Sequence, residues 1–122
     1  MGATNFLKGV LVNGASQDMG LVRTSHGDIE CRIPAWANPG DRVAVCIRPE
    51  SVQVHERPLK ADRNVLEAKV EVVTFLGEYN ECQVLVGTMP VRARLHPSVA
   101  VKRGTQIFLF VPPEMCTLVA RD

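Results

Sequence analysis

Residues 40–50, GDRVAVCIRPE, and residues 104–114, GTQIFLFVPPE, are two versions of one pattern. Each version opens on a glycine, continues through an apolar run and ends in Pro-Glu at the same spacing. This order is typical of a β-strand that starts after a glycine turn. The strand stops at the proline, because proline has no backbone N–H to donate to a neighbouring strand. The pattern therefore predicts that the chain contains one β unit twice.

Matches upstream of this pattern extend the repeat. Asn5-Phe6-Leu7 corresponds to Asn64-Val65-Leu66, so we expect a first repeat over residues 5–55 and a second over 64–120 within one domain of residues 1–122. The polar stretch 56–63, ERPLKADR, is the expected linker. Two similar units can bury equivalent faces against each other and close strand edges that neither closes alone.

Alternation of apolar and polar residues predicts about ten strands and no sustained helix. At residues 28–33, for example, Ile29, Cys31 and Ile33 alternate with polar neighbours. The expected strands are 6–12, 20–24, 28–33, 43–48, 52–55, 65–76, 81–86, 91–95, 107–111 and 117–120, with single turns near 34–38 and 97–101. The alternation slips at Val72 and Val73, which indicates a β-bulge. The segment 107–111 is apolar on both faces, as in a central strand of a sheet. Together these features predict an all-β fold, a compact barrel of two imperfect repeats of about five strands each.

Composition excludes several classes of protein. The chain has 122 residues, 46% of them hydrophobic, and a net charge of +1, as in an ordinary globular protein and without the basic excess of a nucleic-acid binder. Its longest apolar run, 107–111, is too short to cross a membrane, and the N-terminus has no signal-peptide pattern, so we expect a cytoplasmic location and no membrane insertion. Cysteines without any C-x-x-C pair are expected as buried free thiols: Cys31, Cys46, Cys82 and Cys116.

Motifs for catalysis are absent from the sequence. It contains neither the P-loop pattern nor G-x-G-x-x-G, and its three histidines lie outside metal-binding contexts. No serine lies in a G-x-S-x-G elbow. We therefore expect a binding or regulatory module, not an enzyme, with no catalytic residue, metal or cofactor.

Two candidate sites remain. Arg48-Pro49-Glu50, with Glu114 repeating the acid in the second copy, is either a salt-bridged corner that docks a neighbouring domain or a solvated strand end. Arg63-Asn64 and the counterpart Thr4-Asn5 either surround a small oxyanion at the start of a strand or are turn-stabilising residues.

The ordered set of Pro39-Gly40-Asp41, the segment 47–52 (IRPESV) and Phe75-Leu76-Gly77 resembles the C-terminal TOBE region of ABC-importer ATP-binding subunits, which is related to molybdate-binding domains. This resemblance covers nearly the whole chain and implies an OB-like β-barrel. It implies a structural or interdomain corner at Arg48, Pro49, Glu50 and Glu114, and a turn at Phe75-Leu76-Gly77. It also implies ligand contacts at Thr4, Asn5, Arg63 and Asn64.

The resemblance implies an accessory or regulatory domain of an importer's ATP-binding subunit. Its expected partners are the ATPase domain and the second ATPase subunit, with pairing as a homodimer peripheral to the inner membrane. The alternative is a free-standing protein that binds molybdate or sulfate. At 61–68, ADRNVLEA, two residues differ from the molybdate-binding motif, Asp62 and Ala68, and a carboxylate at Asp62 weakens an oxyanion site.

Overall fold

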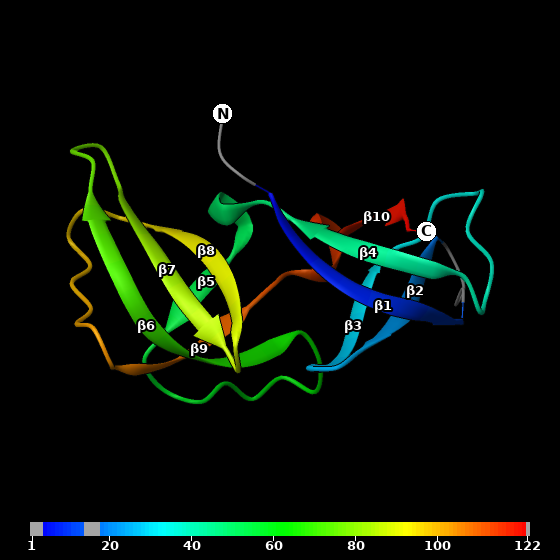
Figure 1. Ribbon diagram of the computed structural model, residues 1–122, viewed down its shortest axis with the longest axis horizontal. Helices are drawn as coiled ribbons and strands as arrows, with labels where there is room; N and C mark the ends of the chain where they lie inside the picture. The colour runs from blue at the N-terminus through cyan, green and yellow to red at the C-terminus, as the bar shows by residue number, and fades with distance from the viewer. Residues whose placement is uncertain (1–3, 14–17, 122) are drawn as a thin grey trace.

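Two five-stranded antiparallel sheets form the part of the chain that the computed structural model describes, residues 4–13 and 18–121 (Figure 1). The first sheet has the order β10 (Thr117–Ala120), β4 (Arg42–Ile47), β1 (Asn5–Asn13), β2 (Met19–Thr24), β3 (Gly27–Arg32). The second has the order β5 (Gln53–His55), β9 (Gln106–Phe110), β6 (Val65–Phe75), β7 (Asn80–Val86), β8 (Met89–Leu95). Each sheet curls into its own lobe, which gives an OB-like β-barrel fold of two repeats.

The two sheets exchange their short edge strands. β5 follows β4 in the chain but pairs with β9, where Val54 lies opposite Leu109. β10 comes last among the strands and pairs with β4, where Leu118 lies opposite Val45. Each expected repeat therefore gives four strands to one sheet and its last strand to the other, so neither sheet is complete without both halves.

One hydrophobic cluster runs through both lobes, because alternate side chains of the strands point inward. Leu7 and Val45 from the first sheet and Leu109 and Val84 from the second are at most 1% exposed. At Gly9 the strands approach so closely that a Cβ would lie 2.5 Å from the Arg23 carbonyl oxygen. The sharp curl of the first lobe thus depends on a residue without a side chain.

The ten predicted strands are confirmed with small shifts at their ends. The register of β6 against β7 slips between Val70 and Val72, so the predicted bulge is present with Glu71 as the extra residue. Both expected single turns form: the Ala37 amide donates to the Pro34 carbonyl and the Val99 amide to the His96 carbonyl.

The two Pro-Glu corners differ from the expected strand ends. Each is a single turn of 3-10 helix, η1 (Pro49–Ser51) and η2 (Pro113–Met115). A proline at the first position of a helix suits this geometry, because that N–H would have no partner in the helix. β9 is the expected inner strand, although its outward Phe108 and Phe110 are only half-buried.

Candidate functional site

Asn5, the first residue of β1, connects the first sheet to the second sheet. It is 7% exposed, and its Nδ2 donates to the Arg92 carbonyl at 2.8 Å, while the Arg92 amide donates back to Oδ1 at 2.8 Å. Because Arg92 lies in β8, this pair of hydrogen bonds connects the two lobes. Both ends of the Asn5 amide are used within the fold.

Asn64 directly precedes β6 of the second sheet and makes the equivalent connection to the first sheet. Its Oδ1 accepts from the Glu30 amide at 2.8 Å, and its Nδ2 donates to the carbonyls of Glu30 at 2.9 Å and Val111 at 2.7 Å. Asn64 is 1% exposed and has a φ of 64°, in the left-handed region that asparagine tolerates better than most residues. The side chain therefore fixes the linker's end to β3 and to the exit of β9.

A shallow pocket of about 330 Å³ lies beside Arg63 and is lined by Glu30, Asp62, Arg63, Phe110 and Pro113. Two carboxylates accompany one guanidinium, so the charge of the lining favours a cation over an oxyanion. The structure places Thr4-Asn5 and Arg63-Asn64 in separate locations, because Asn5 binds β8 and Asn64 binds β3. The four candidate ligand-binding residues thus belong to two locations.

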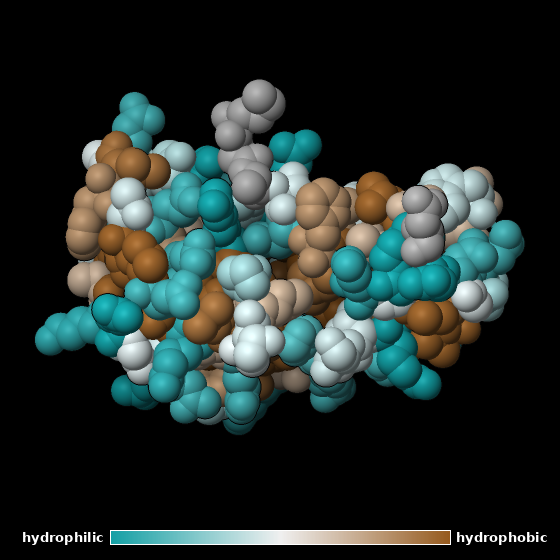
Figure 2. Space-filling view, in the orientation of Figure 1, coloured by the Kyte–Doolittle hydropathy of each residue, from teal (hydrophilic) through white to brown (hydrophobic). Residues whose placement is uncertain are grey.

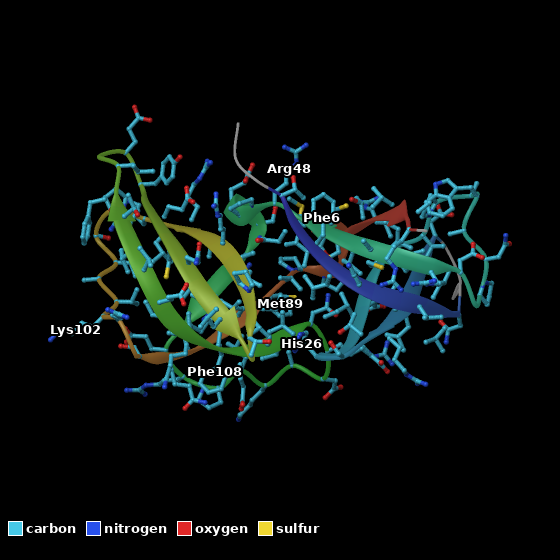
Figure 3. The ribbon with its side chains drawn as sticks, viewed as in Figure 1. Phe6, His26, Arg48, Met89, Lys102 and Phe108 are labelled. Carbon is cyan, nitrogen blue, oxygen red and sulfur yellow. The ribbon has the colours of Figure 1, made fainter. Side chains whose placement is uncertain are left out.

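The corner residues separate into buried and exposed groups. In η1, Pro49 and Ser51 are buried, whereas Glu50 between them and the preceding Arg48 are exposed, and Figure 3 shows Arg48 extending outward. η1 lies against β8. The ion pairs found among the described residues are Arg23–Asp28 and Arg92–Glu81, so Arg48 and Glu50 form no salt bridge there.

η2 mirrors this arrangement against β3. The Arg32 Nε donates to the backbone carbonyl of Glu114 at 2.8 Å, and the Arg32 amide donates to the Cys116 carbonyl at 3.0 Å. Glu114 therefore contributes its main chain to the contact between the halves, and its exposed carboxylate has no part in it.

The β6–β7 hairpin carries apolar side chains at its tip. Phe75 ends β6 and is 74% exposed, and Leu76 is 49% exposed. The Leu76 amide donates to the Tyr79 carbonyl, and Gly77 between them has a φ of 93°. Figure 2 shows apolar surface at this tip, which projects from the second lobe in Figure 1. The family resemblance implied the turn, but exposure of its apolar residues depends on the hairpin extending beyond the core.

The four cysteines are free thiols. Cys31, Cys82 and Cys116 are buried as expected, whereas Cys46 is half-buried. Burial raises the pKa of the Cys31 and Cys116 thiols to about 12 and that of Cys82 to about 11. Such thiols stay protonated and unreactive at neutral pH.

Alkaline pH is expected to destabilise the fold. Unfolded thiols ionise near their ordinary pKa of 9.0, whereas the buried thiols hold their protons up to a pKa of about 11 for Cys82 and about 12 for Cys31 and Cys116. The unfolded state therefore loses protons first above pH 9, and stability falls by up to about 1.4 kcal/mol per pH unit for each thiol. Urea denaturation at a series of pH values measures this slope. Cys82→Ala should make the slope shallower, and an unchanged slope would contradict the prediction.

No helix in the described ranges is both long and apolar enough to cross a lipid bilayer. Nor do those ranges bring together three or more His, Cys, Asp or Glu side chains in a group that could hold a metal ion.

Comparison with known proteins gives three findings. A family model described as the TOBE domain matches residues 45–119. The fold is similar to a crystal structure of the cytoplasmic molybdate-binding protein ModG with molybdate bound, with a TM-score of 0.82, 15% identity and 99% of each chain covered. Comparison with curated proteins gives no match.

Proposed function

Because this chain belongs to the TOBE-domain family, we propose that it is the non-catalytic accessory domain of the ATP-binding subunit of an ABC solute importer. In this role it lies in the cytoplasm at the inner membrane and acts through contacts with the ATPase domain and the second ATPase subunit. The family match covers η1 and the β6–β7 hairpin, which are the segments with the exposed candidate contacts.

The apolar tip of the β6–β7 hairpin is the observation that carries this proposal. Phe75, at 74% exposed, is the most exposed of the large apolar side chains of the described residues. Aromatic and aliphatic side chains that project from a surface are typical anchors of protein interfaces. We assign this tip to the ATPase domain, with the exposed Arg48 and Glu50 at η1 as a separate polar contact.

The outer face of the first sheet is the proposed contact for pairing as a homodimer. Val10 on β1 and Val119 on β10 are each at least 39% exposed on this face. The strand between them is β4, where Val119 lies opposite the buried Ala44. Two copies of this face would give the self-complementary contact of a two-fold dimer. Light scattering should give a dimeric mass, which Val119→Asp should reduce to that of a monomer.

The test of the accessory role uses the importer subunit that carries this domain. A Walker A motif in the same reading frame is expected. In that subunit Phe75→Ser with Leu76→Ser should reduce transport at least fivefold, while the free energy of unfolding changes by less than about 0.5 kcal/mol because both side chains are exposed.

Met115→Ser is the matched control, because Met115 is an exposed apolar residue, at 52%, on η2 and away from the hairpin. It should leave transport unchanged. A lone or unrelated reading frame, or full transport by the hairpin variant, would overturn the proposal.

A second candidate is the binding of a small oxyanion such as molybdate or sulfate. It is favoured by the likeness in fold to a molybdate-bound protein over 99% of both chains. The carboxylates of Glu30 and Asp62 beside Arg63 act against it. Calorimetry with both anions tests it: binding that Arg63→Ala removes supports it, and no heat at millimolar anion rejects it.

A further inference from the structure

A pocket of about 290 Å³ lies where the two lobes meet. Its walls come from three segments that are distant in sequence: β1, the turn between β2 and β3, and the first residue of β8. Figure 3 shows Phe6, His26 and Met89 together in the region between the lobes. The lining residues are Phe6, Leu7, Lys8, Ser25, His26 and Met89.

The chemistry of this pocket is divided between donors and apolar groups. Lys8, Ser25 and His26 supply an ammonium, a hydroxyl and an imidazole, and none of the lining residues is a carboxylate. Lys8 takes part in neither ion pair found among the described residues. The Phe6 ring, 54% exposed, and the half-buried Met89 provide the apolar surface.

The Asn5 hydrogen bonds hold these walls together. Asn5 directly precedes Phe6, and its partner Arg92 lies in β8 close after Met89. The His26 ring also approaches the β7–β8 turn, since its Cε1 lies 3.5 Å from the position of a Cβ added to Gly87. A pocket fixed by such contacts loses little conformational freedom when it binds a ligand.

The duplication provides an internal comparison. Counted from Asn5 and Asn64, the position of Phe6 corresponds to Val65 and that of Lys8 corresponds to Glu67. The backbone frame is thus repeated, while the cation is replaced by an anion and the aromatic ring by a smaller side chain. A lysine at this position therefore occurs in the first repeat and not in the second.

The geometry points to a binding site for a small organic anion, a carboxylate attached to an apolar or aromatic group. The carboxylate accepts charge-assisted hydrogen bonds from Lys8 with Ser25 and His26, and the apolar group packs on Phe6 and Met89. This site goes beyond the proposed accessory role and is separate from the pocket beside Arg63. Inorganic oxyanions lack the apolar part that Phe6 and Met89 favour.

Nuclear magnetic resonance titration of this chain with benzoate, and with benzamide as its uncharged analogue, tests the site. Benzoate should shift the amide signals of Leu7, His26 and Met89 with a dissociation constant on the order of millimolar, as expected for so small a ligand. Lys8→Met should weaken benzoate about tenfold by removing the charge-assisted bond, and since Lys8 is exposed the variant should fold. Glu67→Gln, at the equivalent position, should leave binding unchanged.

Three results would overturn the site: no saturable shifts with benzoate, equal binding of benzamide, or wild-type binding by Lys8→Met. A parallel titration with molybdate and Arg63→Ala separates this site from the second candidate function, because Arg63→Ala should leave benzoate binding intact. Loss of benzoate binding also leaves the transport test of the hairpin unaffected, so the two proposals fail independently.

Discussion

Asn64→Ala is expected to lower the free energy of unfolding by about 3–5 kcal/mol, because it removes three hydrogen bonds and leaves their buried or partly buried backbone partners unsatisfied. Those partners are the amide and carbonyl of Glu30 and the carbonyl of Val111. Alanine also tolerates the positive φ of this position less well than asparagine. Since a domain of this size has a total stability of about 5–15 kcal/mol, the variant should be close to unfolding at 37 °C. Urea denaturation followed by circular dichroism measures the loss.

Two variants separate the causes. Asn64→Gly removes the same hydrogen bonds but tolerates the positive φ, so it should be more stable than Asn64→Ala by about 1 kcal/mol. Asn5→Ala removes two hydrogen bonds instead of three, and should cost less than Asn64→Ala. A loss below about 1 kcal/mol for Asn64→Ala would mean that water replaces the side chain in this contact.

Leu118→Asp is expected to destabilise the first lobe by at least about 4 kcal/mol, since it places a carboxylate in an apolar core without a partner. Leu118 is 7% exposed and lies opposite Val45 in the exchanged strand β10. The variant should lose cooperative unfolding of the first sheet, which thermal melts and the dispersion of amide signals would record.

Val119→Asp is the matched control for this prediction. Val119 is the next residue of the same strand but points outward and is 40% exposed. Its substitution should change the free energy of unfolding of the monomer by less than about 1 kcal/mol. Equal damage from both substitutions would indicate that β10 does not pack as described.

The strands could be predicted from sequence because a strand buried on one face has a local signature. Alternation at 28–33 and the repeated GDRVAVCIRPE pattern predicted both the strands and the duplication. The exchange of β5 and β10 between the sheets had no local sequence signature, since the residues of an edge strand do not specify which strand it pairs with. The sequence predicted two repeats and left unspecified which sheet each last strand would join.

The roles of Asn5 and Asn64 show a similar limit. Their alignment marked them as equivalent and drew attention to them. Their partners are main-chain groups of Arg92 and Glu30, and any residue supplies such groups, so the contacts between the halves left no trace in the sequence. Lys8 and His26 were likewise not combined into one pocket, because they come from a strand and a turn whose approach depends on the packing of the lobes.

The exchanged edge strands also bear on synthesis of the protein. A ribosome releases the segments of the first sheet early, but β4 has no partner on its outer side until β10 has left the exit tunnel. The nascent first lobe therefore exposes an unpaired β4 edge while the whole second half is translated, and such an edge is prone to pair with other chains. We expect nascent chains stalled with β10 still inside the exit tunnel to bind chaperones, and chains in which β10 has emerged to be released from them.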